Sequence, residues 1–98
     1  MGHCVYILEC SDRYNSFYIG YTTDVTRRLG EHNAGMGAKY TRGRTPVAVR
    51  YVEYWNSQSD AMRREWELKQ YSREQKERLV PDADDRVRVV LEPAMDEK

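Results

Sequence analysis

The sequence predicts an α+β fold in which a three-stranded antiparallel sheet is flanked by helices, in the order β-β-α-β-α-α. Three runs, at residues 4–10, 17–22 and 47–55, are rich in the β-branched and aromatic residues that strands favour. The segments after the second and third runs begin with residues that cap helices. The chain has 98 residues, of which 40% are hydrophobic and 33% are charged, and this suits one globular domain.

The first two runs are expected to pair as a β-hairpin, because a polar, turn-like segment at residues 11–16 separates them. A helix is expected to follow from Thr23 or Asp24 to about Ala34. Threonine can cap free N–H groups, and Asp24 suits the positive end of the helix dipole. Gly35 is well placed to end this helix.

A glycine-punctuated loop at residues 35–46 leads to the third strand. Regular alternation along that strand would turn Val47, Val49 and Tyr51 to the same side of the sheet. Glu53 is the next residue in this series and is expected on that side as well.

A second helix is expected over about residues 59–71, capped by Ser57 or the residue before it. Apolar residues recur in it at spacings of three and four, as in an amphipathic helix. Ser72 and Gln75 fit a capping box at the start of a short third helix that runs to about Leu79.

The C-terminal segment differs from the rest of the chain in charge. Residues 1–80 carry 13 Lys and Arg against 10 Asp and Glu, whereas residues 81–98 carry 3 against 6. Residues 86–91 could form a short edge strand, although acidic residues on either side argue for solvent. We therefore predict a domain over residues 1–82 and an acidic C-terminal tail over residues 83–98.

Composition limits the classes of function and the location of the protein. No apolar run is long enough to cross a bilayer, and we find no secretory signal, so we expect a cytoplasmic protein. Cys4 and Cys10 are too far apart along one strand to be bridged, and are expected to be reduced, buried thiols. All charged residues in the segment 36–50 are basic. Such a local positive face can bind polyanions although the formal net charge of the chain is zero. A surface loop can equally be basic without binding anything.

Four side chains on the hairpin and the first helix could act together. Tyr6 and Tyr18 lie on paired strands and can come close on one face of the sheet. A tyrosine hydroxyl titrates near about pH 10, so it needs a cationic neighbour to act as a base near neutrality. Arg28 could be that neighbour, and its planar fork also suits a phosphate. His32, four residues later, shares a helical face with Arg28.

Two further residues complete the candidate site. Glu65 is the carboxylate expected on the inner face of the second helix, where it could hold Mg²⁺ or Mn²⁺ together with water and substrate phosphate. Gly20 is expected to allow a tight turn and the approach of substrate. Taken singly, such residues are also common outside active sites, as core tyrosines, a solvated arginine, a surface histidine and a glutamate paired along its helix. Their combination is what indicates a phosphodiester-cutting site.

The chain resembles the GIY-YIG nuclease family over roughly residues 3–80. Val5-Tyr6-Ile7 is similar to the first signature triplet of the family, and Tyr18-Ile19-Gly20 to the second. Arg28 falls at the expected distance after the glycine, and residues 61–69 resemble the helix that supplies the metal-binding glutamate. Residues 37–46 are similar to the small stand-alone bacterial branch (the YhbQ/YazA-like group, UPF0213), which is itself similar to the nuclease domain of the Slx1 structure-specific endonucleases.

The resemblance implies a GIY-YIG type fold and a divalent-metal-dependent endonuclease that hydrolyses DNA, structure-selectively, in repair or recombination. It implies that Tyr18 helps to deprotonate the attacking water and that Tyr6 assists. Arg28 would hold the phosphate, His32 would support proton transfer and Glu65 would bind Mg²⁺ or Mn²⁺. One departure from the family pattern is that the first triplet reads Cys4-Val5-Tyr6, with Cys4 in place of glycine.

Larger members of the family carry separate domains that choose the DNA site, so here the contacts must come from the domain itself or from a protein partner. The candidate DNA-binding residues are Lys39, Arg42, Arg44 and Arg27. Phosphate contacts position a protein without reading sequence, so we expect weak sequence preference and recognition of branched or single-stranded regions. Two alternatives remain: a nucleic-acid-binding module with little or no catalysis, and a protein-interaction adaptor.

Overall fold

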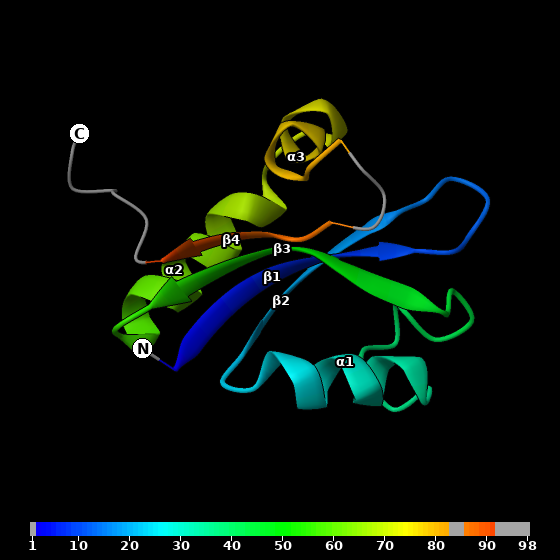
Figure 1. Ribbon diagram of the computed structural model, residues 1–98, viewed down its shortest axis with the longest axis horizontal. Helices are drawn as coiled ribbons and strands as arrows, with labels where there is room; N and C mark the ends of the chain where they lie inside the picture. The colour runs from blue at the N-terminus through cyan, green and yellow to red at the C-terminus, as the bar shows by residue number, and fades with distance from the viewer. Residues whose placement is uncertain (1, 83–85, 92–98) are drawn as a thin grey trace.

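The computed structural model describes residues 2–82 and 86–91 of the chain (Figure 1). Within them, four strands and three helices follow one another along the chain. They are β1 (His3–Cys10), β2 (Phe17–Thr22), α1 (Val25–Asn33), β3 (Val47–Trp55), α2 (Gln58–Lys69), α3 (Arg73–Leu79) and β4 (Arg88–Leu91). The α+β class and the order of the first six elements agree with the prediction.

The sheet has the strand order β2-β1-β3-β4. β1 pairs antiparallel with β2 and β3, and β4 pairs parallel with β3. The predicted three-stranded antiparallel sheet is therefore wrong: the sheet has four strands and is mixed. The short run that could form an edge strand does so, and the α2 and α3 helices supply the long connection that a parallel neighbour requires.

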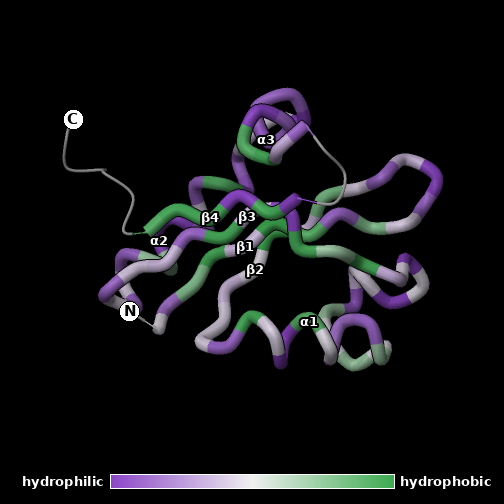
Figure 2. Tube along the Cα trace, viewed as in Figure 1, coloured by the Kyte–Doolittle hydropathy of each residue, from purple (hydrophilic) through white to green (hydrophobic). Residues whose placement is uncertain are grey.

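Helices cover both faces of this sheet. Figure 1 shows α1 on one face, and α2 with α3 on the other. Val5 and Ile7 of β1 pack with Leu68 of α2, whereas Tyr6 and Leu8 belong to the cluster on the α1 side. Because β1 is buried on both faces, its sequence is a nearly continuous apolar run, which appears as the hydrophobic centre of Figure 2.

A bulge in β3 changes which residues face each helix. Ile7 pairs with Tyr51 and Leu8 pairs with Val49, so Arg50 is an extra residue in β3. The expectation that Val49 and Tyr51 share a face is therefore wrong, because Val49 packs on the α1 side and Tyr51 on the α2 side. An extra residue inverts the alternation of a strand, and sequence periodicity alone does not reveal it.

Arg50 is also buried, with 4% of its surface exposed. Its Nε donates to the backbone oxygen of Arg86 over 3.1 Å and its Nη2 to that of Pro81 over 2.9 Å. It also pairs with Glu9. Although Arg50 contributes to the basic run in the sequence, its buried side chain connects the chain after α3 to the sheet.

Side-chain caps fix the start of each helix close to the predicted position. Asp24 caps α1 by accepting from the backbone N–H of Arg27 over 3.1 Å. Ser57 caps α2, and Ser72 and Gln75 form the predicted capping box of α3.

A buried ion pair, which the sequence analysis missed, joins α2 to β3. Glu53 is fully buried and accepts hydrogen bonds from Tyr51 Oη over 2.7 Å and Trp55 Nε1 over 3.0 Å. Its Oε2 also lies 2.9 Å from Arg64 Nη2. Since Arg64 precedes Glu65, this pair helps to fix the rotation of α2 and hence the direction of Glu65.

The described part of the C-terminal segment contains β4, so residues 88–91 lie in the sheet. The division into a domain over residues 1–82 and a tail over residues 83–98 stays a prediction. Cys4 and Cys10 are both buried free thiols. Among the described residues, no helix has the length and apolar character needed to span a membrane.

Candidate active site

The hairpin places Tyr6 directly against Gly20. The two residues are opposite each other in the β1–β2 pairing, and a Cβ atom on residue 20 would lie only 2.4 Å from Tyr6 Oη. Gly20 lies within β2, so the expected tight turn is wrong as the reason for this glycine. Its missing side chain instead leaves the space that the phenol of Tyr6 occupies.

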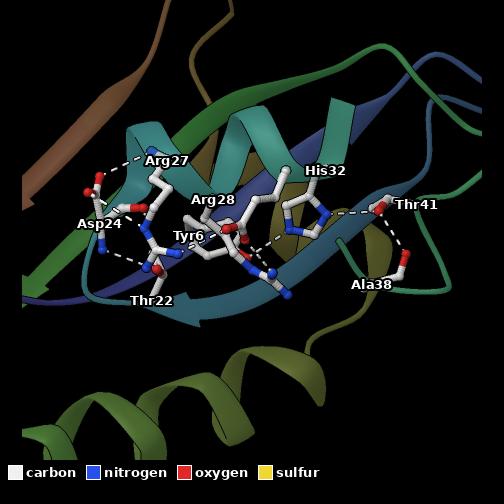
Figure 3. A network of polar contacts seen from close by, with 9 residues as sticks. Tyr6, Thr22, Asp24, Arg27, Arg28, His32, Ala38 and Thr41 are labelled. Atoms are coloured by element: carbon white, nitrogen blue, oxygen red, sulfur yellow. Dashed lines mark hydrogen bonds and ion pairs between the residues drawn. The ribbon is translucent and has the colours of Figure 1, made fainter. Parts of the chain in front are cut away.

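His32 joins the two tyrosines from α1. Its Nε2 lies 3.0 Å from Tyr6 Oη, and its ring centroid lies 5.2 Å from that of Tyr18. The rings of Tyr6 and Tyr18 are 6.3 Å apart. His32 is fully buried, which excludes the alternative that it is a surface residue. The structure thus brings three of the predicted side chains into one cluster. Figure 3 shows the contact between Tyr6 and His32.

Arg28 lies at the edge of this cluster and is held by an acid. Its Nη1 donates to Glu31 Oε1 over 2.8 Å, and Glu31 also accepts from Arg27 over 2.9 Å. Glu31 was not among the predicted site residues, although its spacing of three and four residues from the two arginines is the signal for such pairs on a helix. A substrate phosphate would have to share Arg28 with this carboxylate.

The environment of Tyr6 keeps its hydroxyl protonated. Burial raises the pKa of Tyr6 to about 12, and a hydrogen bond from Arg28 offsets only part of that effect. The expectation that Arg28 would bring this phenol near neutrality is therefore wrong for Tyr6. Burial and the charge of Arg28 lower the pKa of His32, so its imidazole is neutral at pH 7 and can accept a proton.

Glu65 reaches the same region from α2. Its negative charge is one of the influences that raise the pKa of Tyr6, so the carboxylate lies within electrostatic reach of that hydroxyl. The side chain is 16% exposed, and Oε2 lies 3.3 Å from Lys69 Nζ. The described residues contain no group of three or more His, Cys, Asp or Glu that could hold a metal. A single carboxylate still fits Mg²⁺ or Mn²⁺, because such ions commonly take their remaining ligands from water and substrate phosphates.

An open hollow of about 330 Å³ provides access to the cluster. Its wall includes Tyr18 and Tyr40, whose rings are stacked with centroids 6.0 Å apart, and Lys69 and Lys76. Tyr18 is therefore the tyrosine of the cluster that faces this hollow. Lys69 connects the lining of this hollow to Glu65 through their ion pair, although Glu65 itself does not line the hollow.

The candidate DNA-binding residues differ in their exposure and in their contacts within the protein. Lys39 and Arg42 are exposed. Arg44 is bound within the protein, because its Nε lies 3.2 Å from Asp12 Oδ2 and its guanidinium lies 4.2 Å from the ring centroid of Tyr40. Arg27 has an exposed side chain, which pairs with Glu31.

Thr41 is a further residue of the site that the sequence analysis missed. It comes from the loop between α1 and β3, is fully buried, and lies with its Oγ1 2.8 Å from His32 Nδ1. Nothing in the local sequence distinguishes it from a turn threonine, because its partner is nine residues away and the contact depends on how the loop folds back.

The chain is similar to a known protein family and to proteins of other organisms. A family model described as the GIY-YIG catalytic domain matches residues 2–78. A UPF0213 protein of Halobacterium salinarum is 64% identical over 77 residues, which are 79% of this chain and 97% of that protein. A UPF0213 protein of Staphylococcus haemolyticus is 54% identical over 78 residues, which are 80% of this chain and 93% of that protein.

Two solved structures are also similar. The solution NMR structure of a UPF0213 protein from Bacillus halodurans has a TM-score of 0.51 at 52% identity, covering 81% of this chain and 82% of that one. The solution NMR structure of a protein from E. faecalis has a TM-score of 0.55 at 44% identity, covering 80% of this chain and 81% of that one.

Proposed function

Because the chain belongs to the GIY-YIG family, within its UPF0213 group, we propose that it is a divalent-metal-dependent endonuclease that hydrolyses DNA phosphodiester bonds. The observation that carries this proposal is the convergence of one imidazole, two phenols and a guanidinium in one cluster, of which Tyr18 also lines an open hollow. Glu65 lies within electrostatic reach of this cluster, because its charge is one of the influences that raise the pKa of Tyr6. These groups supply an acceptor for a proton, donors for a phosphate and a ligand for a cation.

In the proposed reaction, a water molecule attacks phosphorus and one P–O ester bond breaks, which leaves a phosphate monoester and a hydroxyl. Tyr18, which faces the hollow, helps to draw the proton from the attacking water. Tyr6 assists by passing its own hydroxyl proton to His32 Nε2, 3.0 Å away, as it accepts another. Arg28 holds the phosphate, and its fixed charge opposes the negative charge that grows on the phosphate oxygens.

Glu65 would hold Mg²⁺ or Mn²⁺ in this site. When bound, such an ion polarises the scissile phosphate and stabilises the leaving oxygen. Lys69 Nζ lies 3.3 Å from one carboxylate oxygen of Glu65, Oε2, and would compete with a cation for that oxygen. Lys69 also lines the hollow, where it can then contact a substrate phosphate.

Lys39, Arg42, Arg44 and Arg27 would contact the DNA backbone, and such contacts give affinity without sequence preference. We therefore propose structure-selective action on branched or single-stranded regions, in DNA repair or recombination in the cytoplasm. Of these residues, Lys39 and Arg42 are the most available, because Arg44 is already bound to Asp12.

The test is a cleavage assay of the purified protein on linear, flapped, forked and four-way DNA and on RNA, with and without Mg²⁺ or Mn²⁺. We expect cutting only with the metal, and loss of cutting with retained DNA binding for Glu65→Gln. Glu74→Gln, at an exposed pair on α3, is the control and should cut normally. Cleavage by Glu65→Gln at the wild-type rate would remove the metal role of Glu65.

A second candidate function is binding to nucleic acid without turnover. The pairing of Arg28 with Glu31 and of Glu65 with Lys69 favours it, because both key charges already have partners. Under this alternative the protein would bind the same DNA in low salt, would not need metal, and would leave the DNA intact in every assay condition.

A further inference from the structure

Thr41 is placed to control the protonation of His32. It lies in the loop between α1 and β3 and is fully buried. Its Oγ1 is 2.8 Å from His32 Nδ1 and 3.0 Å from the backbone oxygen of Ala38 (Figure 3). His32 Nε2, on the other side of the ring, is 3.0 Å from Tyr6 Oη. Both ring nitrogens therefore have one partner each.

The number of available protons determines which atom donates and which accepts in each of these hydrogen bonds. A hydroxyl has one proton to donate, and a carbonyl oxygen can only accept. The proton of Thr41 is donated to Ala38, so Thr41 Oγ1 must accept from His32 Nδ1–H. A neutral imidazole carries only one N–H, so Nε2 is bare and accepts the hydroxyl proton of Tyr6.

We propose that Thr41 is a positioning residue that holds neutral His32 as the Nδ1–H tautomer, so that Nε2 is the acceptor for the proton of Tyr6. Its consequence for cleavage rests on the proposed endonuclease function, in which Thr41 acts through His32. When Tyr6 gains a proton on its oxygen and gives its own to Nε2, the ring becomes an imidazolium, and Thr41 Oγ1 continues to accept from Nδ1–H.

The packing of the loop supports this role. A Cβ atom on Gly37 would lie 2.4 Å from His32 Nδ1 and 2.8 Å from His32 Cα, so only glycine allows the backbone to approach the ring this closely. His32 is fully buried beneath it. The loop therefore encloses the Nδ1 side of the ring with Thr41 as the partner there.

The charges around the His32 ring favour the neutral imidazole, which is the form that has two tautomers. The titratable groups that face it are Tyr6 from β1, Tyr18 from β2, and Arg28 and Glu31 from α1. Burial and Arg28 lower the pKa of His32, while Glu31 acts in the opposite direction. At neutral pH the imidazole is therefore uncharged, with one protonated and one bare nitrogen.

The first experiment measures the tautomer directly, by ¹⁵N NMR of the histidine rings in the full chain at neutral pH without DNA or added metal. We expect His32 Nδ1 to show the shift of a protonated ring nitrogen and Nε2 that of a bare one. The opposite pattern would overturn the proposal. This readout needs no catalysis, so it can fail or succeed independently of the proposed nuclease activity.

The second experiment compares Thr41→Val, which replaces the hydroxyl by a methyl group, with Thr41→Ser, which keeps it. We expect Thr41→Val to lose the fixed Nδ1–H tautomer and to lower kcat by about 10- to 100-fold with little change in KM, as loss of an orienting hydrogen bond does. Thr41→Ser should retain the tautomer and most of the rate.

Equal tautomer populations and equal rates in the two variants would overturn the role of Thr41. If Thr41→Val does not fold, the tautomer of the wild-type protein still decides the proposal. If the wild-type protein shows the Nδ1–H tautomer but cuts no DNA with metal present, the endonuclease proposal fails and the tautomer assignment stands.

Discussion

Gly20 controls the position of Tyr6 through the side chain it lacks. A methyl group there would meet the phenol oxygen at 2.4 Å and displace it from His32. The phenol would have to leave its hydrogen bond, since the backbone of β2 is held by β1. The glycine of the Tyr18-Ile19-Gly20 triplet is therefore required by the packing of a catalytic candidate.

We predict that Gly20→Ala destabilises the protein by about 1–3 kcal/mol, the usual cost of overpacking a buried site. Gly30→Ala is the matched control, because Gly30 lies in α1 with nothing within 4 Å of its added Cβ. The free energy of unfolding of Gly30→Ala should rise by about 0.5–1 kcal/mol, because alanine has a better helix propensity than glycine. Denaturant unfolding of both variants measures these changes, and a stable Gly20→Ala variant would contradict the proposed packing.

We also predict that His32 makes stability depend on pH. Its pKa is lowered in the folded protein from the ordinary value of 6.5, so the unfolded chain gains the proton first as the pH falls. The stability that neutral His32 contributes to the folded protein is therefore complete above about pH 6.5. It is lost as the pH falls from there toward the lowered pKa that His32 has in the folded protein. Urea unfolding at pH 7.5 and 5.5 measures this loss as the difference between the two free energies of unfolding. This difference should be smaller in His32→Gln.

Of the candidate site, the sequence predicted the convergence of the two tyrosines with His32, because strand pairing and helix periodicity follow short-range rules. It did not predict Glu31 as the partner of Arg28 or the raised pKa of Tyr6. These depend on rotamers and on burial, which are set by the packed core.

Among the elements, α2 depends on a charge inside the protein for its orientation. Glu53 on β3 is fully buried beside Arg64, and it also receives the hydroxyl of Tyr51 and the indole N–H of Trp55. Breaking such a pair leaves a buried charge without its counterpart, which is costly. The position of Glu65 on the next residue of α2 therefore depends on Glu53.

We predict that Glu53→Gln lowers the free energy of unfolding by about 3–5 kcal/mol, the usual effect of removing one partner of a buried pair. It should also weaken any metal binding at Glu65 by letting α2 rotate. Glu74→Gln makes the same chemical change in an exposed pair with Arg78 and should leave stability nearly unchanged. Similar stability losses in both variants, measured by denaturant unfolding, would show that Glu53 does not orient α2.

The sequence predicted the helix starts well, since caps are local, but it missed two features of β3. The bulge at Arg50 reverses the facing of Val47 and Val49 relative to Tyr51. The parallel pairing of β4 also escaped prediction, because four residues carry little pattern of their own and their partner lies far back in the chain.

At the scale of the whole molecule, the proposed binding of DNA would depend on local positive charge, since the formal net charge is zero. We predict that Lys39→Ala with Arg42→Ala weakens DNA binding at moderate salt and reduces the slope of log K against log salt by about 0.7–0.9 for each phosphate that the variant no longer neutralises. Arg78→Ala, an exposed change on α3, is the control. Unchanged affinity and slope in the double variant would remove the loop from the DNA interface.

We predict that shortening the chain to residues 1–82 lowers stability and promotes self-association. The edge of β3 would lose β4, and Arg50 would lose the carbonyl of Arg86. An open strand edge pairs readily with another chain. Light scattering of the shortened and full-length proteins measures the association, and a monomer of unchanged stability would show that β4 is dispensable.

The fourth strand lies beyond residues 2–78, the span that the family model matches. The candidate reactive groups come from β1, β2 and α1 and, for Glu65, from α2, whereas β4 forms the opposite edge of the sheet from β2. A change in β4 should therefore act on the candidate site through the stability of the sheet and not through a direct contact with the candidate reactive groups.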